Sequence, residues 1–191
     1  EANGPGKLGF LPEVRFSVEH GFFESPFDVN ISTSMPGVTI RYTIDGSTPT
    51  ETNGMVYADP VPITTTTALR AAAFMSDYLP SEVHTQSYLF LEDVIRQPEN
   101  PDGFPLTWGR NFDFPALRFL SGFFNADYQM DPDVVHDPLY ADTIVDDLKS
   151  IPTLSVVLDN EDMVGEDHGI YANTWVVGRE GERPASAELI Y

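Results

Sequence analysis

The sequence predicts a mainly β protein, in which a β-sandwich is followed by a mixed α+β segment with a helix and a strand hairpin. Three observations lead to this prediction. Short runs of alternating apolar and polar residues recur between residues 14 and 90, as half-buried strands require. Turn signals separate these runs at the spacing of a sandwich. After residue 135 the apolar spacing becomes that of an amphipathic helix.

Local residue types support the strands of the first part. Asp45-Gly46 is a hairpin signal, because glycine accepts the positive φ that tight turns need. Pro62 cannot donate to a sheet ladder, so its strand should lie at an edge. The alanines of residues 69–74 favour a helix by propensity, but this run is short and sits among strands, so we predict a strand. Strands are expected at residues 27–32, 38–44, 61–63, 69–74 and 83–90.

Four segments are expected along the chain. Residues 1–13 are a Gly/Pro-rich lead-in, and residues 14–92 form the sandwich. Residues 93–135 are an irregular connector, rich in proline and aromatic residues. Its aromatics are too many for a free linker, so they should anchor the segment or form a ligand or partner surface. Residues 136–191 are the mixed α+β segment.

The last segment should begin with a helix. Asp137-Pro138 suits a helix start, with Asp as N-cap and Pro in the first turn. Apolar residues from Tyr140 to Ile151 fall on one face, and Pro152 ends the helix. We then expect a buried strand at 153–158, an acidic turn or single helical turn at 159–165, and a hairpin of strands 169–173 and 183–191 around Gly178 and Gly181.

Composition excludes several classes of function. The chain has no cysteine, which excludes disulfides, thiolate zinc sites and a cysteine nucleophile. Its 30 acidic and 10 basic side chains give a net charge of −20, which disfavours nucleic acid and anionic membranes as partners. No apolar run approaches the ~20 residues of a membrane span. Residues 1–6 lack the features of a signal peptide, and both chain ends suggest a piece of a longer protein.

One acidic loop is a candidate calcium site. Six oxygen-bearing side chains crowd residues 159–167, and calcium takes six to eight oxygen ligands. The spacing does not fit an EF-hand. The alternative is an exposed acidic turn at the start of a helix, where carboxylates are favourable. The predicted metal ligands are Asp159, Asp162 and Asp167.

The sequence contains no motif of the common metal-dependent or serine-dependent hydrolases. The four histidines, His20, His84, His136 and His168, lack the zinc-peptidase spacing, and no serine-hydrolase elbow is present. We therefore assign no catalytic and no cofactor-binding residue. Exposed aromatics could form a sugar platform or instead anchor the core. The candidates are Trp108, Trp175, Tyr57 and Tyr78.

Two stretches resemble known families. Residues 14–90 carry Val38-Thr39-Ile40-Arg41-Tyr42-Thr43-Ile44-Asp45-Gly46-Ser47-Thr48-Pro49-Thr50 and Leu69-Arg70-Ala71-Ala72-Ala73-Phe74. They resemble the chitobiase/β-hexosaminidase C-terminal module, which is also described as fibronectin-III-associated. The resemblance implies an immunoglobulin-like (Ig-like) sandwich, an accessory beside enzymes and adhesins without chemistry of its own.

The second stretch covers residues 134–191. Ser150-Ile151-Pro152-Thr153-Leu154-Ser155-Val156-Val157, then Gly169-Ile170-Tyr171-Ala172-Asn173, then Glu182-Arg183-Pro184-Ala185-Ser186-Ala187-Glu188 resemble the start of a CotH-family, spore-coat-type kinase domain. The family often has an aromatic before Glu-Arg-Pro, where this chain has Gly181. The resemblance implies ATP and magnesium only in a complete kinase domain, whose nucleotide-binding lysine and metal-binding acids match no position here.

Together these patterns predict a non-catalytic fragment of an exported or cell-surface protein. It would join the Ig-like module to the start of a CotH-like protein kinase, as in large exported proteins of planctomycete-like bacteria. The alternative is a structural, adhesion or assembly component of the cell surface, with a glycan as a further candidate ligand. Expected partners are other protein chains or the rest of the same protein.

Overall fold

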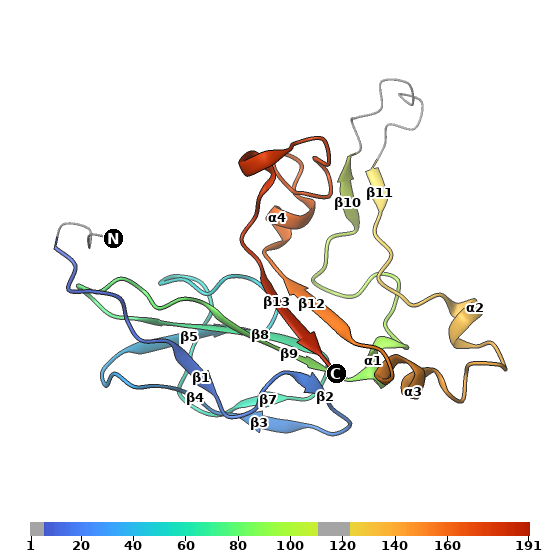
Figure 1. Ribbon diagram of the computed structural model, residues 1–191, viewed down its shortest axis with the longest axis horizontal. Coiled ribbons are helices and arrows are strands. Elements are labelled where there is room, and N and C mark those ends of the chain that lie inside the picture. The colour runs from blue at the N-terminus through green and yellow to red at the C-terminus, as the bar shows by residue number, and fades with distance from the viewer. Residues whose placement is uncertain (1–5, 111–122) are drawn as a thin grey trace. The chain divides into compact units, whose positions relative to one another are not determined.

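The computed structural model describes residues 6–110 and 123–191 (Figure 1). It is mainly β, as predicted, with short helices. The chain forms two compact units. Unit 1 contains Glu1–Leu91, Pro152–Val157 and Ser186–Tyr191, and unit 2 contains Glu92–Ile151 and Leu158–Ala185. This grouping differs from the predicted segments, because two stretches after residue 150 belong with the sandwich.

Unit 1 contains a five-stranded sheet in the order β2-β9-β8-β5-β6. The pairing of β2 with β9 is parallel, and the other neighbours are antiparallel. These strands are β2 (Gly21–Phe22), β9 (His84–Leu89), β8 (Thr67–Phe74), β5 (Thr39–Thr43) and β6 (Met55–Val56).

Two antiparallel strand pairs form the opposite layer of the sandwich (Figure 1). One joins β1 (Val14–Phe16) to β4 (Ile31–Thr33), and the other joins β3 (Phe27–Val29) to β7 (Val61–Ile63). Asn30 separates β3 from β4, so the strand predicted at 27–32 is divided in two. The core between the layers is made of Leu11, Val14, Val29, Ile31, Ile40, Val61, Ile63, Leu69, Ala71, Ala73, Tyr88 and Phe90.

The alanine-rich run is a strand, as predicted. Leu69, Ala71 and Ala73 alternate into the core, where all three are fully buried. Sheet pairing on both sides, with β5 and β9, overrides the intrinsic helix preference of alanine. The small side chains fit a strand that is buried on both faces.

An aromatic cluster closes one end of the sandwich core. The rings of Phe23 and Phe27 lie edge-on to Tyr88, with centroids 5.6 and 5.2 Å from its ring. Phe90 stacks nearly parallel to Phe27, at an interplanar angle of 12°. The Tyr88 hydroxyl donates a hydrogen bond of 2.8 Å to the carbonyl of Val18. A buried tyrosine thus keeps its polar end satisfied.

The lead-in is partly built into unit 1. The amide of Leu79 donates to the carbonyl of Gly9, and the amide of Leu11 donates to the carbonyl of Leu79. Leu11 belongs to the core. The glycines of this stretch permit positive φ, as at Gly9. Residues 6–13 therefore run along the edge of unit 1, where they form backbone hydrogen bonds with Asp77 and Leu79.

A third strand pair of unit 1 comes from the end of the chain. Strands β12 (Thr153–Val157) and β13 (Ser186–Ile190) pair antiparallel, with Ser155 opposite Glu188 and Leu154 opposite Leu189. The predicted strand at 153–158 is thus confirmed. Its predicted burial is confirmed only in part, because Val157 is buried while Leu154 and Val156 are exposed. We refer to this strand pair as the C-terminal hairpin.

Unit 2 consists of one hairpin and short helices. Strands β10 (Thr107–Arg110) and β11 (Phe123–Asn125) pair antiparallel within the predicted connector, which is therefore not irregular throughout. Phe112, Phe114 and Phe119 lie outside the described residues. The helices are α1 (Leu91–Val94, starting in unit 1), α2 (Pro132–Val135), α3 (Ile144–Lys149), α4 (Asn160–Val164) and a 3₁₀ helix (Gly178–Gly181).

Two local predictions in unit 2 are wrong. The capped helix start is Asp131-Pro132, where the Asp131 carboxylate accepts from the amide of Asp133. The same Asp-Pro signal at Asp137 makes a turn instead, and the helical residues resume only at Ile144. Residues 169–173 form turns and not a strand, so the partner of β13 is β12. The helical turn expected at 159–165 is confirmed as α4.

The burial of Tyr88 predicts an alkaline loss of stability. Burial, and secondarily the Glu188 carboxylate, raises the pKa of Tyr88 above its ordinary value. The unfolded chain releases this proton near pH 10 while the folded chain keeps it, so the free energy of unfolding should fall as pH rises above about 10. Urea unfolding of Tyr88→Phe should show a shallower decline there, by up to about 1.4 kcal/mol per pH unit. Parallel pH curves for the two proteins would contradict this.

Candidate functional site

The C-terminal hairpin lies against strand β9 through a set of hydroxyl and carboxylate groups. Alternation along β9 turns Tyr88 into the core and leaves Thr85 and Ser87 on the opposite face. There the Thr85 hydroxyl donates to the Ser186 hydroxyl at 2.7 Å, and the Ser87 and Ser155 hydroxyls share a hydrogen bond of 2.7 Å. We call this contact the polar seam; it comprises Thr85, Ser87, Ser155, Ser186, Glu188 and His20.

Glu188 is the charged group of the polar seam. Its side chain is only 8% exposed, and Oε2 accepts a 2.6 Å hydrogen bond from the Ser87 hydroxyl. Oε1 lies 3.0 Å from Nδ1 of His20, an ion-pair distance when the imidazole is protonated. The His20 backbone amide donates to the side-chain oxygen of Gln86, which ties its loop to β9. A buried carboxylate is costly unless it is paired in this way.

The polar seam gives the hairpin a defined position rather than a catalytic arrangement. Serine and glutamate lie together, but the hydroxyls are used in strand-to-strand hydrogen bonds. A nucleophilic serine needs a base held by a third group, together with donors for a developing oxyanion. The described residues of the seam supply pairing groups without such donors, so the arrangement suits docking.

The outer face of the hairpin is apolar. Leu154, Val156 and Leu189 are 63%, 53% and 47% exposed, respectively, while the inner face combines the polar residues of the same strands with the buried Val157 and Ile190. Both faces of the hairpin thus carry apolar side chains, whereas an ordinary two-layer sheet exposes a polar face. The inner face makes the hydrogen bonds of the polar seam and also buries Val157 and Ile190.

The Asp45-Gly46 turn supports the same side of the sheet. Gly46 has φ of +78°, as the turn signal requires, and a Cβ built there would contact Val157 of β12 at 3.5 Å. Burial raises the pKa of Asp45, but hydrogen bonds from the Ser47 hydroxyl and amide outweigh it, and the pKa is lowered overall. Buried Arg70 donates to the Gly46 carbonyl at 2.8 Å. The turn is thus held by hydrogen bonds to the sheet.

The predicted calcium ligands lie on and after α4. Asp159 is the residue before α4, Asp162 is in its first turn, and Asp167 is exposed. Among the described residues, no group of three or more acidic, histidine or cysteine side chains is arranged to hold a metal ion. Asp162 instead lies 3.4 Å from Nε2 of His168 and 3.7 Å from Nε of Arg183. The calcium site stays a prediction.

Arg183 organises the loops around α4. Its guanidinium donates to the backbone carbonyls of His168, Glu180 and Glu182, and it pairs with Asp162. Only 15% of its side chain is exposed. The planar, five-donor guanidinium can reach several carbonyls at once, which a lysine cannot.

A local steric restriction explains why residue 181 is a glycine, at the position where the CotH family often has an aromatic residue. A Cβ at this position would lie 2.5 Å from the carbonyl oxygen of Val176, far inside van der Waals contact. Gly181 is the last residue of the 3₁₀ helix formed by residues 178–181. A larger residue would have to displace the backbone at Val176.

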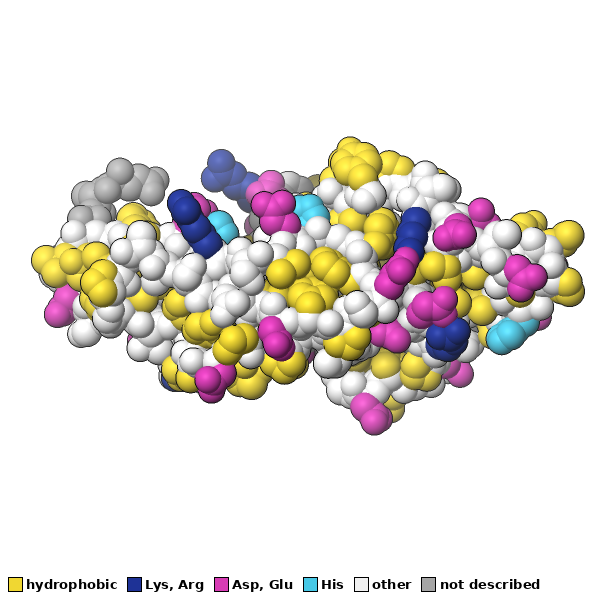
Figure 2. Space-filling model, turned by 90° about the horizontal axis from the view of Figure 1, so that it is seen from below, with side chains coloured by type: hydrophobic (Ala, Val, Ile, Leu, Met, Phe, Trp, Pro, Cys, Tyr) yellow, Lys and Arg dark blue, Asp and Glu magenta, His cyan; other side chains and the backbone are white. Residues whose placement is uncertain are grey.

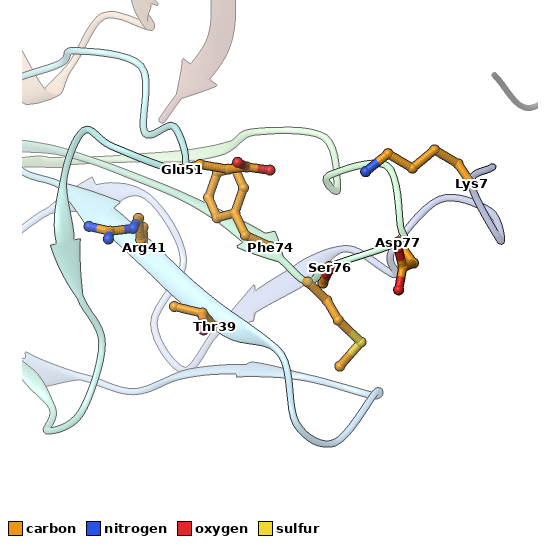
Figure 3. Close-up of a pocket in the computed structure, with 8 residues that line it drawn as sticks. Lys7, Thr39, Arg41, Glu51, Phe74, Ser76 and Asp77 are labelled. Atoms are coloured by element: carbon orange, nitrogen blue, oxygen red, sulfur yellow. The ribbon is translucent and has the colours of Figure 1, made fainter. Parts of the chain in front are cut away.

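A hollow of about 440 Å³ lies on unit 1, beside the ends of β5 and β8 (Figure 3). Lys7, Arg41, Glu51 and Asp77 bring charges of both signs to it. The Arg41 guanidinium already donates a hydrogen bond of 2.8 Å to the carbonyl of Gly54 within the protein. The hollow is open and mixed in charge, so it offers no selective arrangement for a ligand.

A second cavity of about 340 Å³ lies in unit 2 and is lined chiefly by aromatic side chains. Trp108, one of the predicted sugar-platform residues, is part of it, while Trp175 is not. Tyr57 and Tyr78 instead pack against the sandwich core, as the alternative interpretation held. The lining residues are Phe104, Trp108, Tyr128, Asn160, Met163, Val164 and Tyr171.

The sequence indicates some of these residues and not others. His20 lacks a metal-ligand spacing, yet it pairs with Glu188 across 168 positions of sequence. No local pattern marks such a pair. The acidic side chains are dispersed across the face seen in Figure 2, which fits a solvated surface better than one binding patch. In the described part of the chain, none of the helices combines the length and apolar character that crossing a bilayer requires.

Arg183→Lys tests the organising role of this arginine. Lysine keeps the charge but loses the fork, so one or more of the carbonyls of His168, Glu180 and Glu182 would lose its donor. We expect a loss of about 1–3 kcal/mol in unfolding free energy and faster amide exchange in residues 158–185. Arg179→Lys, at an exposed position of the same loop, is the control and should change little. Equal effects of the two substitutions would contradict the role.

Comparison with known proteins identifies one part of the chain. The family model of the chitobiase/β-hexosaminidase C-terminal domain matches residues 18–85. The family comparison gives no indication of a CotH kinase part. No curated protein and no solved structure matched the chain. The Ig-like sandwich of unit 1 is therefore the part similar to the chitobiase/β-hexosaminidase C-terminal domain, over about a third of the chain.

Proposed function

We propose that this chain is a non-catalytic accessory segment of an exported, surface-associated protein, in which the Ig-like sandwich anchors the C-terminal hairpin. The observation that carries the proposal is the polar seam. Through it, strands from residues 153–157 and 186–190 join a sandwich completed by residue 90.

The similarity of residues 18–85 supports the accessory role. The matched domain is named for the C-terminal part of chitobiase and β-hexosaminidase, which suggests a module associated with carbohydrate-active enzymes. An accessory module is expected to share its chain with another unit, and this chain contains a second unit. Export is part of the proposal on the same ground, since such glycosidases act outside the cell.

The finer proposal concerns residues 136–191, which we infer to be the start of a CotH-like kinase domain. Its support is the order of three sequence motifs, two of which have local structural roles here. Ser150–Val157 contains β12, and Glu182–Glu188 supplies both Arg183 and Glu188. Residues that would bind a nucleotide and its magnesium are proposed to lie outside this chain.

A structural or adhesion role is the second candidate. The exposed apolar outer face of the hairpin, with Leu154, Val156 and Leu189, favours it, because a contiguous apolar face on a surface often marks a contact. Under this proposal the second unit would be an interaction surface and not part of an enzyme. A glycan array with this chain tests whether carbohydrate takes part.

A double-mutant cycle tests the polar seam. Glu188→Ala leaves the Ser87 hydroxyl without its acceptor, and Ser87→Ala leaves the carboxylate without its donor. We expect each to cost about 1–3 kcal/mol in unfolding free energy, with a coupling energy of about 1 kcal/mol or more. Hydrogen exchange should show the hairpin losing protection before β5 and β8 do. Glu182→Ala, at an exposed position nearby, is the control.

Independent effects of Ser87→Ala and Glu188→Ala would sink the seam as the connection between hairpin and sandwich. So would uniform loss of exchange protection over hairpin and sandwich, because the hairpin would then have no separate attachment. A hairpin that stays protected in both variants would also contradict the proposal, because its attachment would then not depend on these two side chains.

A nucleotide-binding assay tests the finer proposal. Titration of the chain with ATP and magnesium chloride should give no saturable heat or fluorescence change, because no phosphate-binding lysine has been assigned here. Under the proposal, a longer protein that continues past residue 191 would bind ATP under the same conditions. Micromolar affinity of this chain, about −8 kcal/mol, would contradict it.

A further inference from the structure

We propose that the aromatic cavity of unit 2 is a binding site for a trimethylammonium group. This cavity is separate from the polar seam, and nothing in the proposed accessory role requires it. Its seven described lining residues include four aromatic rings, with Met163 and Val164 as the aliphatic wall. The volume of about 340 Å³ is within the range of small-molecule sites.

The rings meet at steep angles, as the walls of a cage do. Trp108 stands at 88° to Tyr128 with ring centroids 5.5 Å apart, and at 72° to Tyr171 with centroids 5.8 Å apart. Phe104 is inclined at 58° to Tyr128, with centroids 5.4 Å apart. All four rings line the same cavity, so their mutual angles surround it with aromatic surface in several orientations. Ring faces carry the negative part of the aromatic quadrupole, so this volume favours a cation.

Charge around the cavity points in the same direction. None of the seven described lining side chains carries a positive or negative charge, so none of these seven repels a cation. Helix α4 contributes Asn160, Met163 and Val164 to the wall and also carries the acidic Glu161. The chain as a whole has a net charge of −20. An anionic ligand would meet an unfavourable potential, and a cationic one a favourable potential.

Hydrogen-bonding capacity narrows the kind of cation. A primary ammonium has three N–H donors that must be satisfied when it leaves water. The cavity has few acceptors for them: the amide of Asn160 and the tyrosine hydroxyls, and the Tyr128 hydroxyl already donates to the carbonyl of Pro105 at 2.9 Å. A trimethylammonium group has no N–H, so it loses little on entry. Its methyl groups also suit the apolar wall.

The small number of hydrogen-bonding groups among the described lining residues also argues against a sugar as the primary ligand. A pyranose ring stacks on one exposed aromatic face, while its hydroxyls need several donors and acceptors at the rim. Here the rings stand at 58–88° to one another, and Asn160 is the one polar side chain that is not aromatic among the described lining residues. Sugar binding is therefore an outcome to be compared in the test and not the proposal.

A trimethylammonium group can come from free choline, from a phosphocholine head group or from a trimethylated lysine of another protein. Titrations of the full chain with choline, phosphocholine and trimethyllysine distinguish these sources. The Trp175→Phe background leaves Trp108 as the only tryptophan, so its fluorescence reports on the cavity. We expect saturable quenching and chemical-shift changes confined to the lining residues.

The neutral isostere of choline, 3,3-dimethylbutan-1-ol, is the decisive comparison. It has the same shape and apolar surface but lacks the charge. A cation–π site should bind choline tighter than this alcohol by roughly three- to thirty-fold. Equal binding of the two would overturn the proposal, because the cavity would then be only a hydrophobic pocket. N-acetylglucosamine in place of both tests a sugar site, and its tighter binding would overturn the proposal as well.

Variants assign the binding to the rings. Tyr171→Leu removes one wall but keeps apolar volume at a position that is 44% exposed, so folding should be preserved. We expect about a three- to tenfold weaker affinity for choline with an unchanged unfolding midpoint. Tyr140→Leu is the matched control, since Tyr140 is 48% exposed and does not line the cavity. Trp108→Phe keeps a ring and should weaken binding less than Trp108→Leu does.

Two further results would overturn the proposal. One is the absence of saturable binding by any trimethylammonium probe up to about 10 mM, which corresponds to less than about 3 kcal/mol of binding free energy. The other is equal weakening by Tyr171→Leu and Tyr140→Leu, because the effect would then not arise in the cavity. Neither result bears on the polar seam, so this site and the accessory role can fail separately.

Discussion

The hydrogen bond between Ser87 and Glu188 is the constraint on which the attachment of the C-terminal hairpin to the sandwich of unit 1 depends. A carboxylate that is 8% exposed is tolerated only where its partners are in place, and here they come from β9 and from the loop before β2. A slip of the hairpin by one residue would put Leu189 or Ala187 at this position and turn Glu188 outward. The polar seam therefore fixes the register as well as the attachment of the C-terminal hairpin.

The same constraint accounts for the unusual face pattern of the hairpin. Ordinary sheet packing buries apolar side chains, and the hairpin would then face β9 with Leu154, Val156 and Leu189. Those residues are exposed, and the inner face combines the buried Val157 and Ile190 with polar side chains that bond to the serine and threonine on the outer face of β9. Directional bonds of this kind contribute less free energy than apolar burial but tolerate fewer alternative arrangements.

Much of the sandwich is predictable because its signals are local. Alternation at residues 38–44 and 83–90, the turn at Gly46 and the proline-bearing edge strand all follow from side-chain period and backbone preference. The last segment is harder. Thr153–Val157 has the composition of a buried strand, but its environment depends on which strand it joins. The pairing of β13 with β12 rather than with residues 169–173 depends on long-range contacts, which no local pattern contains.

The candidate sites show the same limit. Residue type alone points to Trp108, yet the cavity needs Tyr171 and Met163 from distant positions to close around it. Acidic residues 159–167 suggest calcium by density alone, whereas Asp162 lies beside His168 and Arg183. Density of one residue type predicts the composition of a surface, but the geometry that makes a site comes from folding.

The polar seam also bears on the order in which the parts of unit 1 fold. Thr85 meets Ser186 and Ser87 meets Glu188 across 101 residues of sequence. Bringing together chain segments so far apart carries a length-dependent entropy cost of about 4 kcal/mol. The sandwich, made from residues 6–90 through closer contacts, can gather first, and the hairpin then joins as a late step. Nascent chain emerging in order would hold a finished sandwich with an uncovered hydroxyl-bearing face on β9 until the final strand arrives.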